Sequence, residues 1–179
     1  MSTTGKVVPL VALAFCLSPT EASAAPPRTD PVIASFGATL ITNPTTHSCT
    51  GSDGSYTELT DTFSGPVVSS DPRLNGTLTV TADILVNTTT GFGAGSGTWS
   101  VKNLLGQVLV SGTFKGAVSG LVLFKGFAEG TSAQGEKFFG NISVVVAGNA
   151  AVGSIGAPLA AVPTEPATFQ VGSCVGTGP

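Results

Sequence analysis

The chain has 179 residues, and with 7 Lys or Arg against 10 Asp or Glu its formal net charge is −3. Disordered chains combine low hydrophobicity with high charge, whereas 41% of these residues are hydrophobic and 9% are charged, which excludes a wholly disordered protein. The 24 glycines and 12 prolines disfavour helices and favour short strands and turns, so we expect an all-β fold. Nucleic acid is not an expected partner, because the basic residues are dispersed and the net charge is negative.

The N-terminal segment has the pattern of a signal peptide. Lys6 precedes the apolar run Val7–Leu17, and Ala22–Ala24 supplies the small residues that a signal peptidase reads. The run is shorter than the ~20 residues of a membrane-spanning helix, so no membrane span is expected. Cys16 is a poor lipidation site, because a bulky residue precedes it. We expect cleavage near Ala24 and a secreted or periplasmic protein.

Cleavage would leave one domain behind a short leader. Residues 25–31 form a Pro-rich leader, and residues 32–179 fit a single domain. Cys49 and Cys174 are then an even pair in an exported chain, which predicts one disulfide between the first part of the domain and its end. Two cysteines without a histidine pair make a poor zinc site, so no metal is expected.

Period-two alternation predicts most of the domain as a strand meander. The clearest case alternates apolar residues with threonines from Thr77 to Val86. A polar loop is expected over Asn43–Ser55, a turn over Asp71–Gly76, and either a loose strand or a covering segment over Ala147–Pro166. The predicted strands are Val32–Thr42, Tyr56–Ser64, Val67–Ser70, Thr77–Val86, Thr98–Asn103, Gln107–Lys115, Leu121–Ala128, Lys137–Val146 and Thr168–Cys174.

About eight strands with short turns and glycines inside them favour a single antiparallel meander that closes into a β-barrel. Glycine inside a strand relieves crowding where a barrel turns a corner, and closure removes exposed edges. The alternative is a two-sheet β-sandwich, which uses similar strands but needs longer Greek-key connections.

One stretch of the chain resembles a known family. Gly95-Ser96-Gly97-Thr98-Trp99, then Gly106 and Gly112-Thr113-Phe114-Lys115-Gly116, is similar to the Gly-Ser/Thr-Gly-x-aromatic stretch of allene oxide cyclase and dirigent-like β-barrels. The resemblance implies an eight-stranded, calycin-like barrel with an apolar cavity, which in many such proteins forms a homo-oligomer. It carries over no catalytic residue.

The Gly-rich segment Gly91–Gly97 lacks both common phosphate-binding patterns and has no helix after it, so no nucleotide cofactor is expected. A flexible hairpin loop is the expected structure.

Aromatic residues at alternating positions usually fill a core. Trp99, Phe92, Phe114 and Phe124 are also our candidates for lining or covering a ligand cavity.

The polar candidates do not form a recognisable catalytic set. His47 is the only histidine, and no strained nucleophile turn accompanies it, which favours a surface role. Asp53, Glu58, Asp61 and Asp71 lack the ligand spacing of a calcium loop. Because Glu58 and Asp61 are an odd number of residues apart, they face opposite sides of a regular strand.

A polar strand face and three asparagines are candidate surface features. Asp83 shares a polar face with the threonines of its strand, and this face is either the barrel exterior or a polar lumen. Asn75, Asn87 and Asn141 match the acceptor pattern for N-linked glycans. In a glycosylating host we expect Asn75 and Asn87, at turn and loop edges, to be modified more readily than Asn141 within a strand.

Three functional classes follow. The first is a secreted barrel without catalytic activity that binds a small apolar ligand or a surface. The second is a cyclase- or isomerase-like enzyme acting on an apolar substrate, and the third is a structural extracellular protein. An apolar cavity would favour the first, convergent polar groups within it the second, and a filled interior the third.

Overall fold

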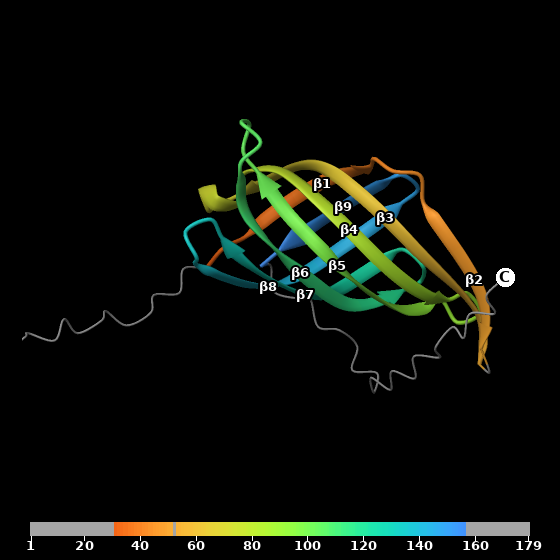
Figure 1. Cartoon of the computed structure of the whole chain (residues 1–179). Coiled ribbons are helices and arrows are strands. Elements are labelled where there is room, and N and C mark those ends of the chain that lie inside the picture. The colour runs from red at the N-terminus through yellow and green to blue at the C-terminus, as the bar shows by residue number, and fades with distance from the viewer. Residues whose placement is uncertain (1–30, 52, 157–179) are drawn as a thin grey trace, which may run out of the picture. The chain divides into compact units, whose positions relative to one another are not determined.

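The computed structural model describes residues 31–51 and 53–156, which form nine strands and one short 3-10 helix (Figure 1). In chain order the elements are β1 Ala34–Leu40, β2 Thr45–Gly51, β3 Gly54–Ser69, η1 Pro72–Leu74, β4 Gly76–Asn87, β5 Phe92–Lys102, β6 Val108–Ser119, β7 Leu123–Ser132, β8 Lys137–Ala147 and β9 Ala150–Ile155. The predicted signal peptide, nearly all of the leader and the predicted strand Thr168–Cys174 lie outside the described residues.

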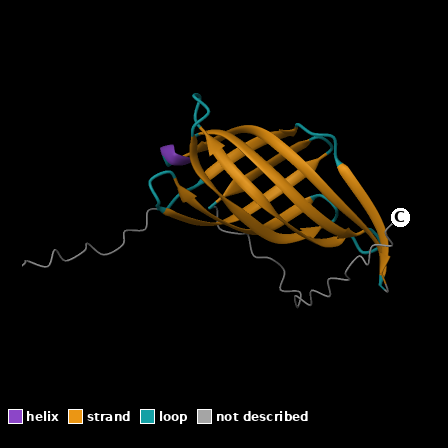
Figure 2. Ribbon diagram, viewed as in Figure 1, coloured by secondary structure: helices purple, strands orange, loops and turns teal. Residues whose placement is uncertain are grey.

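All of the strands except β2 close into an eight-stranded antiparallel barrel. The sheet order is β1-β9-β8-β7-β6-β5-β4-β3-β2, and β1 pairs with both β9 and β3, which closes the ring. Figure 2 shows the strands wrapping obliquely around one interior. The predicted all-β barrel is confirmed, and the sandwich alternative is excluded.

The predicted polar loop Asn43–Ser55 is wrong, because most of it is strand β2. Along β3, the pairing with β1 ends at Leu40 opposite Phe63, and the pairing with β2 begins at Thr45 opposite Thr60. The first half of the long β3 thus gains a partner where β1 has ended. Side chains on both faces of β2 are mostly exposed, so this strand has no apolar alternation by which the sequence could reveal it.

Two further boundaries differ from expectation. The predicted strands Tyr56–Ser64 and Val67–Ser70 are one strand, β3, because β4 pairs continuously with it through Gly65 and Pro66. On the other side, the register with β1 is interrupted at these two residues, so the missing N–H of the proline is tolerated there. The segment Ala147–Pro166, left open by the sequence, contains β9.

The Gly-rich segment Gly91–Gly97, predicted as a loop, lies mostly in β5. Gly95 and Gly97 alternate with outward-facing residues and are on the interior side of the strand, opposite Ile84 and Ala82 on β4. Aromatic rings lie over such glycines: a Cβ on Gly97 would be 2.9 Å from the ring of Phe114. The absence of a side chain at these glycines therefore lets interior rings approach the backbone of the barrel wall closely.

The short helix η1 lies at one end of the barrel (Figure 2). Leu74 of this short helix is buried in the main core cluster. Arg73 beside it pairs with Asp71 and donates to Glu136 Oε2 at 2.6 Å, which joins the β3–β4 connection to the β7–β8 turn. Hydrogen bonding to Arg73 holds the pKa values of both carboxyls below their usual range. β2 lies toward the opposite end (Figure 1).

Candidate functional site

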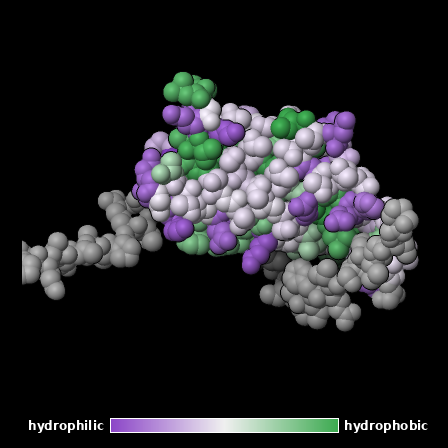
Figure 3. Space-filling view, viewed as in Figure 1, coloured by the Kyte–Doolittle hydropathy of each residue, from purple (hydrophilic) through white to green (hydrophobic). Residues whose placement is uncertain are grey.

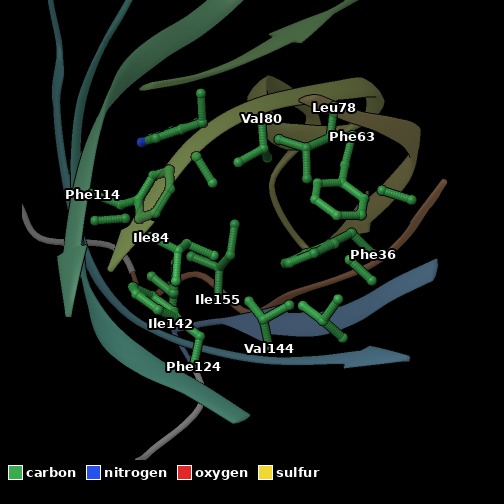
Figure 4. Close-up of a pocket in the computed structure, with 16 residues that line it drawn as sticks. Phe36, Phe63, Leu78, Val80, Ile84, Phe114, Phe124, Ile142, Val144 and Ile155 are labelled. Carbon is green, nitrogen blue, oxygen red and sulfur yellow. The ribbon is translucent and has the colours of Figure 1, made fainter. Parts of the chain in front are cut away.

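The barrel interior contains an apolar cavity. Its volume is about 70 Å³, several times the roughly 10–15 Å³ that one water needs. The space is therefore larger than that of a single water molecule. Figure 4 shows labelled side chains from different strands directed at this space. The sixteen described residues that line it are all apolar or aromatic: Phe36, Ala38, Phe63, Leu78, Val80, Ala82, Ile84, Trp99, Phe114, Phe124, Ala128, Ile142, Val144, Val146, Ala151 and Ile155.

The cavity follows from how the core is packed. Ala38, Phe63 and Ala151 form a small core cluster that is separate from the main one, and residues of both clusters line the void. Alanine, with its small side chain, occupies several of the lining positions. Since the rings lie against glycines of the wall, the side chains do not fill the axis of the barrel.

The lining aromatic residues are held in fixed orientations. The Trp99 indole Nε1 donates to the backbone oxygens of Thr113 and Glu129, at 3.2 Å each. Its ring packs edge-on against Phe138 with centroids 5.5 Å apart, and Phe114 and Phe124 form a second such pair at the same separation. The only polar atom of Trp99 is thus already bonded to the wall, and its ring presents apolar surface to the void.

Of the four aromatic residues singled out from the sequence, three lie on this cavity. Trp99, Phe114 and Phe124 line it, whereas Phe92 is 55% exposed at the start of β5 and does not. Phe36 and Phe63, which are not among these four, also line the void. The period-two pattern places them on one face of their strands, but only the closure of β1 against β3 shows what they face.

Asp61 is a polar residue next to residues that line the cavity. It is on β3 two residues before Phe63 and directly opposite Ala82 on β4, and both of these neighbours line the cavity. Side chains two apart on a strand share a face, so Asp61 is on the interior face of β3, although it is not one of the residues that line the void. Its Oδ1 is buried without a hydrogen-bond partner, and burial raises the pKa of the carboxyl.

The remaining polar candidates are dispersed over the outside. His47 is exposed on β2, and Asp53 accepts a hydrogen bond from the Tyr56 hydroxyl at 2.6 Å. Asp83 accepts one from Thr60 Oγ1 at 2.7 Å, so its polar face is the barrel exterior. Glu58, which faces away from Asp61 as predicted, lies with Asp83 along an open hollow on the outer wall. Within residues 31–51 and 53–156, no group of three or more His, Cys, Asp or Glu could hold a metal ion.

The glycan acceptor residues lie in unequal surroundings. Asn75 is exposed between η1 and β4, and Asn141 is exposed on the outer face of β8. Asn87 is only 5% exposed, and its Oδ1 accepts from the backbone N–H groups of Thr89 and Thr90. Burial therefore disfavours modification of Asn87, contrary to the order expected from the sequence.

Cys49 is on β2, and because Cys174 is outside the described residues, their disulfide stays a prediction.

The described part of the chain has no helix that is long and apolar enough to cross a membrane. Comparison of the chain with family models, with curated proteins and with solved structures finds no match.

Proposed function

We propose that this protein is an exported β-barrel that binds one small, largely apolar molecule in its cavity. The observation that carries the proposal is the void among Phe36, Trp99, Phe114 and Phe124, with its wholly apolar lining. An apolar lining favours an apolar molecule over water, because water there would lack hydrogen-bond partners. The proposal that the protein is exported rests on the signal-peptide pattern around Val7–Leu17.

The cavity supports this function over the two alternatives. A cyclase or isomerase needs polar groups that converge on its substrate, and none of the described lining residues supplies a titratable group. The indole N–H of Trp99 is already bonded to Thr113 and Glu129. A purely structural barrel gains most from a filled interior, because an empty cavity costs stability.

Titration with methylcyclohexane, followed by tryptophan fluorescence, tests the proposal. Trp99 is the only tryptophan of the chain and lines the cavity, so binding there changes its emission directly. Ala128→Leu places a larger side chain in the void and should abolish the saturable change. Ala147→Leu makes the same substitution at an exposed position of β8 and should leave the change intact. A wild-type protein that shows no saturable change contradicts the proposal.

One observation favours attachment to an apolar surface as a second candidate function. Leu104 and Leu105, at the β5–β6 turn, are 100% and 84% exposed, and hydrophobic side chains form the protruding tip in Figure 3. Asn103 orders this turn, because its Oδ1 accepts from the N–H groups of Leu105 and Gln107. Retention on a phenyl-agarose column tests this role: Leu104→Ser with Leu105→Ser should abolish it, and unchanged retention would contradict it.

A further inference from the structure

The open hollow on the outer wall has opposite charges on its two sides. The carboxylates of Glu58 on β3 and Asp83 on β4 lie on one side. The ammonium groups of Lys115 on β6 and Lys125 on β7 lie on the other. The residues between the two sides are mostly small: Ala94, Gly95, Ser96, Gly116 and Ala117.

These charges are placed symmetrically about β5, which crosses the middle of the hollow. Asp83 and Lys115 pair with the same residue of β5, Ser96, from its two sides. Glu58 and Lys125 end the neighbouring row of paired residues, each two strands from β5. Each carboxylate therefore has an ammonium group at the equivalent position across β5.

The two sides of the hollow do not neutralise each other within one copy of the chain. Among residues 31–51 and 53–156, the ion pairs are those that Arg73 makes. Glu58 and Lys125 are separated by the strands from β3 to β7, which is about 19 Å along the sheet at ~4.8 Å per strand. A partner that satisfies all four charges therefore has to be as wide as the wall itself. A second copy of the chain carries the matching charges at the same spacing.

We propose that this hollow is an interface between two copies of the chain, related by a twofold axis parallel to β5. Rotation about this axis exchanges the two sides of the hollow. Glu58 of each copy then faces Lys125 of the other, and Asp83 faces Lys115, so each pair occurs twice. A twofold interface uses the same patch on both subunits, and that patch has to be complementary to itself, as this one is.

The small residues of the hollow allow the two walls to approach, and the long lysine side chains span the remaining space. Exposed ion pairs contribute little free energy singly, so their main effect is to fix the orientation of the two copies. The interface is on the outer wall, whereas the proposed ligand is inside the barrel. The two proposals can therefore fail independently.

Sedimentation equilibrium of the full chain tests the inference. The wild-type protein should form dimers, and a higher salt concentration should weaken them, because salt screens exposed charges. Lys115→Glu with Lys125→Glu makes the whole hollow acidic, and Glu58→Lys with Asp83→Lys makes it basic. Either variant alone places like charges opposite each other, which should raise the dimer Kd about a hundredfold or more. An equimolar mixture of the two variants should form heterodimers, because an acidic hollow then faces a basic one.

The matched control is Lys102→Glu with Lys137→Glu. It makes the same change of charge at two exposed lysines that do not line the hollow, and it should leave the dimer intact. Circular dichroism verifies that every variant is folded. A wild-type protein that is monomeric at about 1 mM contradicts the inference. So do dimers that survive either charge reversal, or reversed variants that stay monomeric when mixed.

Discussion

Replacing Gly97 by alanine should destabilise the barrel, because the interior rings need the space of the glycines. A Cβ at this position would be 2.9 Å from two atoms of the Phe114 ring and closer still to the backbone oxygen of Thr81 on β4. The backbone of a paired strand cannot move as a flexible side chain does. Forcing extra atoms into a packed interior costs about 1–3 kcal/mol.

The matched control is Gly37→Ala on β1. A Cβ on Gly37 meets nothing within 4 Å, and its backbone does not require a glycine. Alanine at such a position reduces the entropy of the unfolded chain and stabilises a protein by about 0.4–1 kcal/mol. The two identical substitutions should therefore have effects of opposite sign.

Thermal unfolding followed by circular dichroism measures both variants. At roughly 4 °C per kcal/mol for a domain of this size, Gly97→Ala should lower the Tm by about 4–12 °C, and Gly37→Ala should raise it by about 2–4 °C. Gly97→Ala should also weaken methylcyclohexane binding, because the displaced Phe114 ring moves into the void. If the two variants unfold at the same temperature, the aromatic rings do not depend on the space at the glycines.

The remaining predictions concern charge and covalent structure. Because burial raises the pKa of Asp61 above 3.8 in the folded state, its ionisation costs stability as the pH rises. Asp61→Asn should therefore stabilise the protein slightly near neutral pH, and urea titrations should show this gain vanishing in acid. At pH values above the usual carboxyl pKa range, Arg73→Gln should lower the Tm slightly, because Arg73 lowers the pKa values of its partners Asp71 and Glu136. The decrease should be smaller in high salt or in acid. The intact mass of the protein, purified from an oxidising compartment, should show no free thiol at Cys49 or Cys174, and two free thiols would disprove the disulfide.

The sequence predicted the strands that alternate clearly and missed those that do not. Thr77–Val86 matches β4 within a residue at each end, because its apolar residues all face one interior. The polar β2 has no such alternation, since its strand state depends on pairing with β3. In Gly91–Gly97 the interior positions are glycines, so the sequence shows no apolar alternation there. The aromatic rings that pack against these glycines come from other strands.

The candidate site was predictable only in part. The aromatic character of Trp99, Phe114 and Phe124 suggested a cavity lining, and period two placed each on one face of its strand. Whether a face is interior depends on the register of strands far apart in sequence. This is why the sequence does not separate Phe92, which is 55% exposed, from the lining residues, and does not set Asp61 apart from the other carboxylates.

A crystal structure of the protein under xenon pressure tests the central claim most directly. Xenon binds in dry apolar cavities and scatters strongly, so its position is seen without assuming any natural ligand. The account predicts a xenon site inside the barrel, bounded by Trp99, Phe114 and Phe124. A side-chain-filled interior without xenon, or a void occupied by ordered water, would contradict it.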